Sequence, residues 1–264
     1  MHRVLWTSAL AAAVVAGYLT GSLHGLAALW VAIAGALAWS FAHAHSRVAR
    51  VTLAVVFALY AIAMGFALLP GFDRVVLVGQ LVLSPGAAPY DIAVGFPKVV
   101  TGIFVLGFIS PSLISRHGIG AALGKAVPVF AATALVVMIA VFAMGYTAWA
   151  PKWTNLFLLW APINLFFTCL SEEALFRGFL QYQLARIGTR SRSAQLAALA
   201  FAATLFGLAH IGGGVNYAIA ATLAGLGYGW AFQRTQRIEA SVAVHFGVNA
   251  VHFLVFVYPT FATV

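Results

Sequence analysis

The sequence predicts an all-α membrane protein, a polytopic bundle of about eight or nine transmembrane helices. Apolar residues make up 63% of its 264 residues and charged residues only 7%, whereas roughly 25% of an ordinary soluble domain is charged. Apolar runs of about 20 residues, the length that a helix needs to cross a bilayer, recur along the chain. A transmembrane β-barrel is disfavoured because barrel strands alternate in short segments, while these runs are continuously apolar.

Nine apolar segments are expected to form the spans. They cover residues 4–20, 25–43, 51–69, 99–115, 127–148, 154–185, 194–212, 215–233 and 240–258. The sixth segment is too long for one simple crossing, and Pro162 is expected to kink or offset its start. Prolines and glycines interrupt residues 70–98, which predicts a loop there, with residues 75–83 lying flat on the membrane.

Basic residues are distributed unevenly between the two sides of the predicted bundle. With the N-terminus inside, ten lie in inner segments: Arg3, Arg47, Arg50, Arg116, Lys125, Arg186, Arg190, Arg192, Arg234 and Arg237. Three lie in outer segments, namely Arg74, Lys98 and Lys152. This excess predicts that the N-terminus is inside. The first segment lacks a clean cleavage site followed by a polar domain, so we expect a retained anchor rather than a cleaved signal peptide.

The net charge of +9 does not indicate a nucleic-acid partner, because the basic residues are scattered in short loops and form no patch. The predicted surroundings are instead the lipid bilayer of a cell membrane. The single cysteine, Cys169, excludes an intrachain disulfide and any multi-cysteine metal site.

Two of the five acidic residues, Glu172 and Glu173, are adjacent within a strongly apolar run. A carboxylate at bilayer depth is costly unless it is paired, solvated or protonated, so this pair marks a candidate functional site. Glu173 and Arg177 are four residues apart on one helical face, which predicts an ion pair. Glu172 points about 100° away and is expected to be free for chemistry. The alternative is that all three residues form a buried polar lock between helices.

Two later spans carry further polar residues. Phe206 and His210 are four residues apart, and so are His245 and Asn249, with His252 one turn further along. A single histidine in a membrane helix often only forms hydrogen bonds with its neighbours. Two histidines and an asparagine, all downstream of a glutamate pair, favour a functional site.

These patterns read Glu-Glu-x-x-x-Arg at 172–177, Phe-x-x-x-His at 206–210 and His-x-x-x-Asn at 245–249, in this order on separate apolar segments. In them the chain resembles the CPBP family of intramembrane proteases, which includes the CAAX prenyl endopeptidases and the bacteriocin-processing (abortive-infection) proteases. The resemblance covers about residues 127–258.

The resemblance implies two regions: residues 1–126 as N-terminal transmembrane segments of unknown role, and residues 127–264 as a protease core. It implies an intramembrane endopeptidase of the inner or plasma membrane, which cuts a membrane-associated protein or peptide near a C-terminal tail or leader. Prenylated CAAX tails and hydrophobic C-terminal sorting signals are both compatible substrates.

Four residues are the implied catalytic groups: Glu172, His210, His245 and Asn249. Three others are expected to support the site: Glu173, Arg177 and Phe206. Peptide hydrolysis needs an activated water and a stabilised oxyanion. We expect Glu172 to be the general base, and His210 to hold the same water and protonate the leaving amine. The imidazole and carboxamide of the last span would donate hydrogen bonds to the oxyanion.

Two alternatives stay open. Glu172, His210 and His245 would make an acceptable catalytic zinc set, but His-Glu-x-x-His is absent from the sequence and the ligands come from three spans. A mechanism without a metal or other cofactor is therefore the predicted one. A transporter or scaffold with a proton or solute path is the non-enzymatic alternative, because carboxylates and histidines form such paths in membranes.

Other protease classes fit less well. Ser171 lacks the setting of a serine nucleophile, Asp91 lies in the predicted loop without a second aspartate motif, and Cys169 is expected to be a packing residue. The predicted helix ends place Glu172 about 20 Å, and His245 less than about 10 Å, from the inner surface. Helices must therefore tilt or break around the site, and Gly207 and Gly247 would allow close helix contact there.

Overall fold

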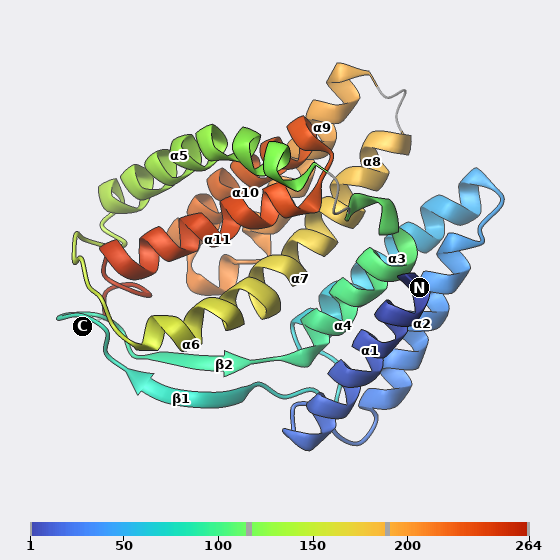
Figure 1. The fold of residues 1–264 in the computed structure, drawn as a ribbon, viewed down its shortest axis with the longest axis horizontal. Helices are drawn as coiled ribbons and strands as arrows, with labels where there is room; N and C mark the ends of the chain where they lie inside the picture. Colours follow the sequence, from blue (N-terminus) through green and yellow to red (C-terminus); the bar gives the residue numbers. More distant parts are fainter. Residues whose placement is uncertain (1, 115–117, 188–190, 263–264) are drawn as a thin grey trace.

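Helices dominate the computed structural model, which describes residues 2–114, 118–187 and 191–262. Helices α1 to α4 gather on one side of the molecule, and α5, α10 and α11 on the other (Figure 1). The long helix that contains α7 lies between these two groups and contacts both. A β-hairpin runs along the edge of the bundle below it in this view. This central position matters because the long helix carries both glutamates.

The N-terminal helices lie close to the predicted spans. They are α1 (His2–Leu19), α2 (Ala27–Ala42), α3 (Arg47–Gly65) and α4 (Phe96–Phe104), the last continuing through a π-helical turn (Val105–Ile109) and a 3₁₀ turn (Pro111–Leu113). Helix α3 begins earlier than predicted because the Ser46 hydroxyl accepts a hydrogen bond from the Ala49 amide and caps the helix before its arginines.

The predicted loop between α3 and α4 instead contains two antiparallel strands, β1 (Val75–Leu81) and β2 (Tyr90–Val94). The expectation of a loop without secondary structure is wrong for these residues, and the fold is mostly rather than entirely helical. That residues 75–83 lie flat on the membrane stays a prediction. The valines of β1 favour a strand, and the prolines and Gly86 fall in the connection between the strands. Asp91 lies on β2, where its carboxylate accepts hydrogen bonds from Arg74 and from the Gln80 amide.

Helices of the C-terminal half pack around one another. They are α5 (Ile119–Ala143), α9 (Arg192–Leu208), α10 (Val215–Thr235) and α11 (Ile238–Val255), with a 3₁₀ turn (Ile211–Gly213) between α9 and α10. A Cβ on Gly207 would lie 1.8 Å from Thr222 Oγ1 on α10, and one on Gly247 2.7 Å from Phe130 Cε2 on α5. The prediction of close helix contact at these two glycines is confirmed.

The sixth predicted span is one long helix that changes geometry along its length. Its parts are α6 (Leu156–Ile163), a π-helical stretch (Asn164–Cys169), α7 (Leu170–Glu173), a second π-helical stretch (Ala174–Gln181) and α8 (Tyr182–Ile187). Pro162 lacks an amide hydrogen and lies two residues before the first π-helical stretch, so the predicted disturbance near it is present. Glu172 and Glu173 lie between the two wide stretches, which frequently occur at functional sites.

Among the residues that the structure describes, four helices are long and apolar enough to cross a membrane: Arg47–Gly65, Ile119–Ala143, Leu156–Arg186 and Ile238–Val255. Shorter apolar helices cover Val4–Leu19, Ala27–Ala42, Phe96–Ile109 and Arg192–Leu208. The protein is therefore a multi-pass membrane protein, while the exact count of eight or nine crossings remains a prediction.

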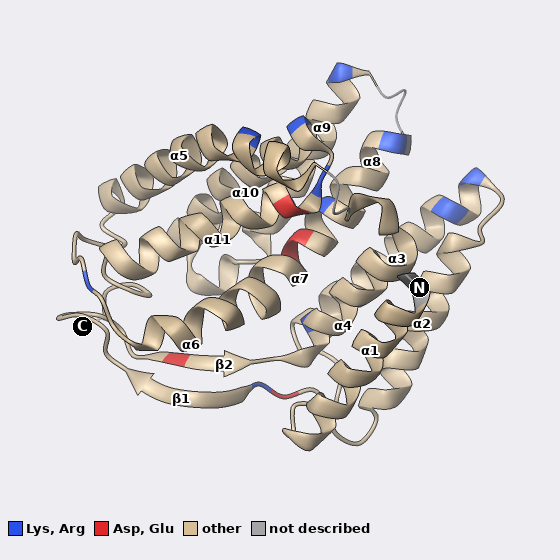
Figure 2. Ribbon diagram, in the orientation of Figure 1, with Lys and Arg blue, Asp and Glu red and all other residues tan. Residues whose placement is uncertain are grey.

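Several arginines of the predicted inner segments gather at one end of the molecule, at the start of α3, the end of α8 and the start of α9 (Figure 2). The side that this end faces remains a prediction, and Arg116 and Arg190 lie outside the described residues. Lys98 departs from the predicted pattern, because it lies in the first turn of α4 rather than in an outer loop.

Candidate active site

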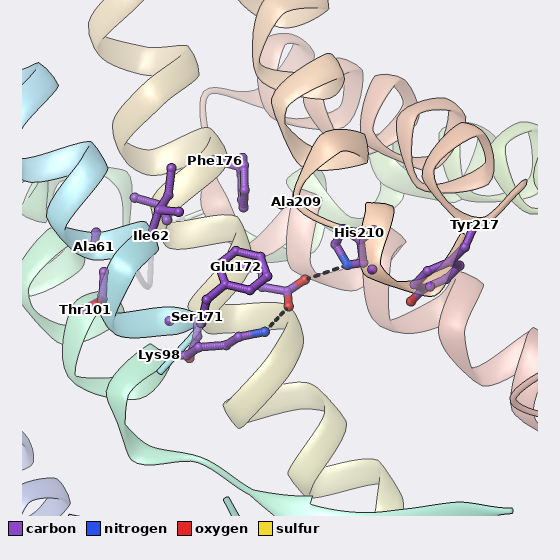
Figure 3. A pocket seen from close by; sticks show the side chains of 15 residues that line it. Ala61, Ile62, Lys98, Thr101, Ser171, Glu172, Phe176, Ala209, His210 and Tyr217 are labelled. Atoms are coloured by element: carbon purple, nitrogen blue, oxygen red, sulfur yellow. Dashed lines mark hydrogen bonds and ion pairs between the residues drawn. The ribbon is translucent and has the colours of Figure 1, made fainter. Parts of the chain in front are cut away.

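Glu172 lies near the middle of the long helix, and its carboxylate faces basic side chains from two other parts of the chain. Lys98 Nζ is 2.8 Å from Oε1, and His210 Nε2 is 3.9 Å from Oε2 (Figure 3). Only 8% of the Glu172 side chain is exposed. Within the described part of the chain, Oε2 has no hydrogen-bond partner. One carboxylate oxygen is thus paired with a cation, and the other is directed at the imidazole.

Lys98 is the site residue that the sequence analysis missed. We expected Glu172 to be free for chemistry and predicted no cation beside it, whereas the ammonium of Lys98 donates a hydrogen bond to its carboxylate. The signal was present in the sequence: Lys98 is the only charged residue of Phe96–Phe104. A lysine within an apolar helix needs a partner, but the residue to which it pairs lies 74 positions later. Spacing alone could not identify that partner.

The orientation of His210 follows from the end of α9. The Phe206 carbonyl lies in the last turn, where helical carbonyls lose their usual amide donors, and His210 Nδ1 lies 2.7 Å from it. A carbonyl can only accept, so Nδ1 carries the hydrogen and donates it. In the neutral imidazole, Nε2 then presents its lone pair toward Glu172. Glu172 Oε2 and His210 Nε2 are therefore two acceptors that face each other.

Glu173 has a different environment, although it is the next residue. Its carboxylate accepts hydrogen bonds from Arg177 Nη1 at 2.9 Å, from His245 Nδ1 at 2.8 Å and from the Ser241 hydroxyl. The side chains of Glu173 and Arg177 are fully buried. The structure has the ion pair that the four-residue spacing predicts. Glu173 thus joins the long helix to α11, and both of its carboxylate oxygens accept hydrogen bonds from other side chains of the protein.

Arg177 continues this buried network toward α9 and α10. Its Nη2 donates a hydrogen bond to the Gly225 carbonyl at 2.9 Å, and its guanidinium lies 4.7 Å from the centre of the Phe206 ring. The same ring packs 4.5 Å from the His210 ring and 5.7 Å from the His245 ring, centre to centre. Phe206 therefore separates the buried Glu173–Arg177 pair from His210 and holds both in place. A polar lock between helices does exist, but Glu172 lies outside it.

Asn249 is held by the long helix rather than by the histidines. Its Nδ2 lies 3.2 Å from Asn164 Oδ1 and 3.6 Å from the sulfur of Cys169. Asn164 is a second residue that the sequence analysis did not single out, and it begins the first π-helical stretch. Cys169 is fully buried and donates to Asn164, so it packs and bonds within the helix.

All four predicted catalytic residues line one cavity of about 540 Å³. The helices thus bring Glu172, His210, His245 and Asn249 to the same space, as the sequence analysis required. A second cavity of about 320 Å³ lies against α3, where Ala61, Ile62 and Phe66 contribute apolar walls. Glu172, His210 and Lys98 line both cavities and so stand where the two meet. Figure 3 shows the second cavity from close by.

The arrangement does not fit the three-ligand zinc site that was considered as an alternative. Among the described residues, no three histidine, cysteine, aspartate or glutamate side chains are close enough to hold a metal ion. In that set, the Lys98 ammonium occupies one oxygen of Glu172, and the Glu173 carboxylate occupies Nδ1 of His245.

The fold and site therefore describe a multi-pass membrane protein with a buried glutamate–histidine centre. Residues 153–251 match the family model described as Rce1-like, type II CAAX prenyl endopeptidase Rce1-like, so this part of the chain is similar to that family. The match confirms the predicted family and includes all seven predicted site residues, whereas Lys98 lies outside it. A match to this family implies an intramembrane protease. Neither a curated protein nor a solved structure matches the chain significantly.

Proposed function

We propose that this protein is an intramembrane endopeptidase that hydrolyses a peptide bond with a water molecule activated by Glu172. One observation carries the proposal: a buried carboxylate oxygen without a protein hydrogen bond, among the described residues, faces a histidine nitrogen at 3.9 Å beside a cavity. The family of residues 153–251 supports the same reaction class. No cofactor enters the proposed mechanism.

The two facing acceptors suit a water molecule, which can donate one hydrogen to Glu172 Oε2 and the other to His210 Nε2. As the water oxygen bonds to the substrate carbonyl carbon, Glu172 takes its proton. When the carbon–nitrogen bond breaks, that proton reaches the leaving amine through His210. Lys98 remains on the other carboxylate oxygen and keeps Glu172 ionised and oriented at membrane depth.

His245 and Asn249 are proposed to stabilise the oxyanion. The Asn249 carboxamide bonds Asn164 and Cys169 through Nδ2, which carries two hydrogens. His245 donates Nδ1–H to Glu173, so its Nε2 can donate to an oxyanion only when the ring is protonated at both nitrogens. Glu173 would then be the counter-ion of that imidazolium, a role for it beyond its pairing with Arg177.

The proposed substrate is a membrane-anchored protein or peptide, cut near a C-terminal tail or leader in the inner or plasma membrane. The apolar walls that α3 supplies to the second cavity suit apolar substrate side chains next to Glu172. This proposal assigns the N-terminal region a role, since α3 and α4 would form part of the substrate site within one membrane-embedded unit.

Proteomics of membrane-protein C-termini tests the proposal. Cells that carry Glu172→Gln or His210→Ala are expected to accumulate full-length substrate, while Glu239→Gln, which removes a carboxylate paired with Arg237 outside the site, leaves the termini as in wild type. A transporter would lose transport in the Glu172 variant without accumulating any uncleaved protein. Identical termini in wild type and the Glu172 variant, with both proteins present in the membrane, would refute the protease.

A further inference from the structure

A pocket of about 430 Å³ lies away from the glutamates, between the start of α3 and α8. His45, Arg47 and Arg50 line one wall, and Gln183 and Arg186 line the other. These two segments are far apart in the sequence and come from different regions of the chain. Figure 2 shows basic residues at the start of α3 and near the end of α8, at the same end of the molecule.

The charge of this pocket is positive on both walls. The chain has only five acidic side chains, and each one contacts a basic side chain away from this pocket: Asp73 with His24, Asp91 with Arg74, Glu172 with Lys98, Glu173 with Arg177, and Glu239 with Arg237. The described residues that line the pocket include no acid. Arginines gathered around one space repel one another unless an anion lies between them.

Local contacts orient two of the arginines without using all their donors. Arg50 Nη2 donates to the Ala44 carbonyl at 3.3 Å, and Arg186 Nη1 donates to the Tyr182 hydroxyl at 2.6 Å. The Arg186 guanidinium also lies 5.1 Å from the centre of the Tyr182 ring. A guanidinium has five N–H donors in a planar fork that matches the oxygens of a phosphate group. Each side chain therefore keeps donors for a ligand.

The pocket lies where a membrane surface is expected. Helix α3 is one of the four helices long and apolar enough to cross a membrane, and Arg47 is its first residue. Val48 beside it is 77% exposed, so an apolar side chain points outward next to the arginines. Arginines at the end of an apolar span lie at the level of lipid headgroups.

We infer that this pocket binds a phosphate group, carried either by an anionic phospholipid headgroup or by a free phosphate ion. Arg50 and Arg186 clamp the phosphate from opposite walls, Arg47 adds positive charge, and the His45 ring can donate a hydrogen bond. A clamp of this kind also ties α3 to α8 and hence joins the N-terminal helices to the long helix. The inference does not depend on the proposed protease reaction.

The test uses the purified full-length protein and the double variant Arg50→Ala/Arg186→Ala. In this variant we expect phosphatidylglycerol to bind roughly thirtyfold more weakly than in wild type. Native mass spectra should then show less retained phosphatidylglycerol. Phosphatidylglycerol nanodiscs should also give less thermal protection relative to phosphatidylcholine nanodiscs. The control Arg192→Ala/Arg234→Ala removes the same charge from two residues that do not line this pocket. This control measures how much of the binding comes from general attraction to anionic lipid. It should weaken phosphatidylglycerol binding much less than Arg50→Ala/Arg186→Ala does.

A separate titration with inorganic phosphate in detergent distinguishes the two sources. Protection by phosphate alone, lost in Arg50→Ala/Arg186→Ala, would identify a free phosphate site, and protection only by phosphatidylglycerol would identify a lipid site. Equal losses in the two double variants, or no protection from either anion, would overturn the inference. The single variants Arg50→Gln and Arg186→Gln repeat the comparison if the double variant does not fold.

Discussion

Lys98 Nζ lies 2.8 Å from Oε1 of Glu172, and this contact joins helix α4 of the N-terminal region to the proposed general base. The lysine side chain is 41% exposed and the glutamate side chain is 8% exposed, and both residues line the two cavities. The family match begins at residue 153. An essential electrostatic partner of the proposed base therefore comes from outside the region that matches the family.

The first prediction concerns this lysine. Lys98→Met should lower kcat/KM roughly tenfold, since loss of the cation removes about 1.4 kcal/mol from the orientation of a partly screened carboxylate. Lys98→Arg should keep most of the activity because it restores a donor and a positive charge. Cleavage kinetics of the purified variants measure both effects. Lys125→Met, which removes an exposed lysine on α5, is the matched control and should behave as wild type. Equal kcat/KM in Lys98→Met and wild type would contradict the role of Lys98.

The two adjacent glutamates should respond oppositely to substitution. Glu173→Ala leaves the buried Arg177 without its carboxylate partner, and breaking such a pair costs about 3–5 kcal/mol. Loss of folded protein is expected, visible as a lower thermal midpoint and poor recovery in detergent. Glu172→Gln keeps a polar group of similar size near Lys98, so the protein should fold but lose activity by a factor of 100 or more, roughly the contribution of a general base. If instead Glu173→Ala folds as well as Glu172→Gln, the division of roles between them is wrong.

Helix periodicity explains why much of this site could be predicted from the sequence. Residues four apart share a helical face, so Glu173 and Arg177 had to meet, and Glu172 had to face elsewhere. The same four-residue spacing predicts that Phe206 and His210 share one helical face, and that His245 and Asn249 share a face of another helix. Apolar runs of sufficient length located the helices, because the bilayer limits what can cross it.

The rest of the site depends on contacts between distant segments, which periodicity cannot specify. Lys98 was assigned to an outer loop because prolines and glycines precede it, and its partner lies 74 residues away. The link between Asn164 and Asn249 spans 85 residues, and it depends on a π-helical stretch that regular spacing does not predict. The hairpin formed by β1 and β2 was missed for a similar reason, since its strands are stabilised by each other.

The second cavity leads to a prediction about substrate binding. Ile62 on α3 lines this cavity, and Ile62→Trp should fill part of its volume of about 320 Å³. We expect a higher KM with kcat close to wild type, because the Glu172 carboxylate contacts Lys98 and His210, so that a change at Ile62 would act on substrate binding alone. Leu59→Trp is the control, since Leu59 lies on the same helix and is 63% exposed. A lower kcat with unchanged KM would show that the cavity does not hold substrate.

Metal removal gives the last prediction. Within the part of the chain that the structure describes, no three histidine, cysteine, aspartate or glutamate side chains are close enough to hold a metal ion, so zinc binding would require the side chains of the site to move. Purified protein should therefore keep its peptidase activity after prolonged treatment with a strong chelator, and added zinc should not raise it. An unrelated zinc peptidase treated in parallel confirms that the chelator works. Activity that disappears on chelation and returns with stoichiometric zinc would contradict the metal-free mechanism, and it would require Glu172, His210 and His245 to move closer together around the ion.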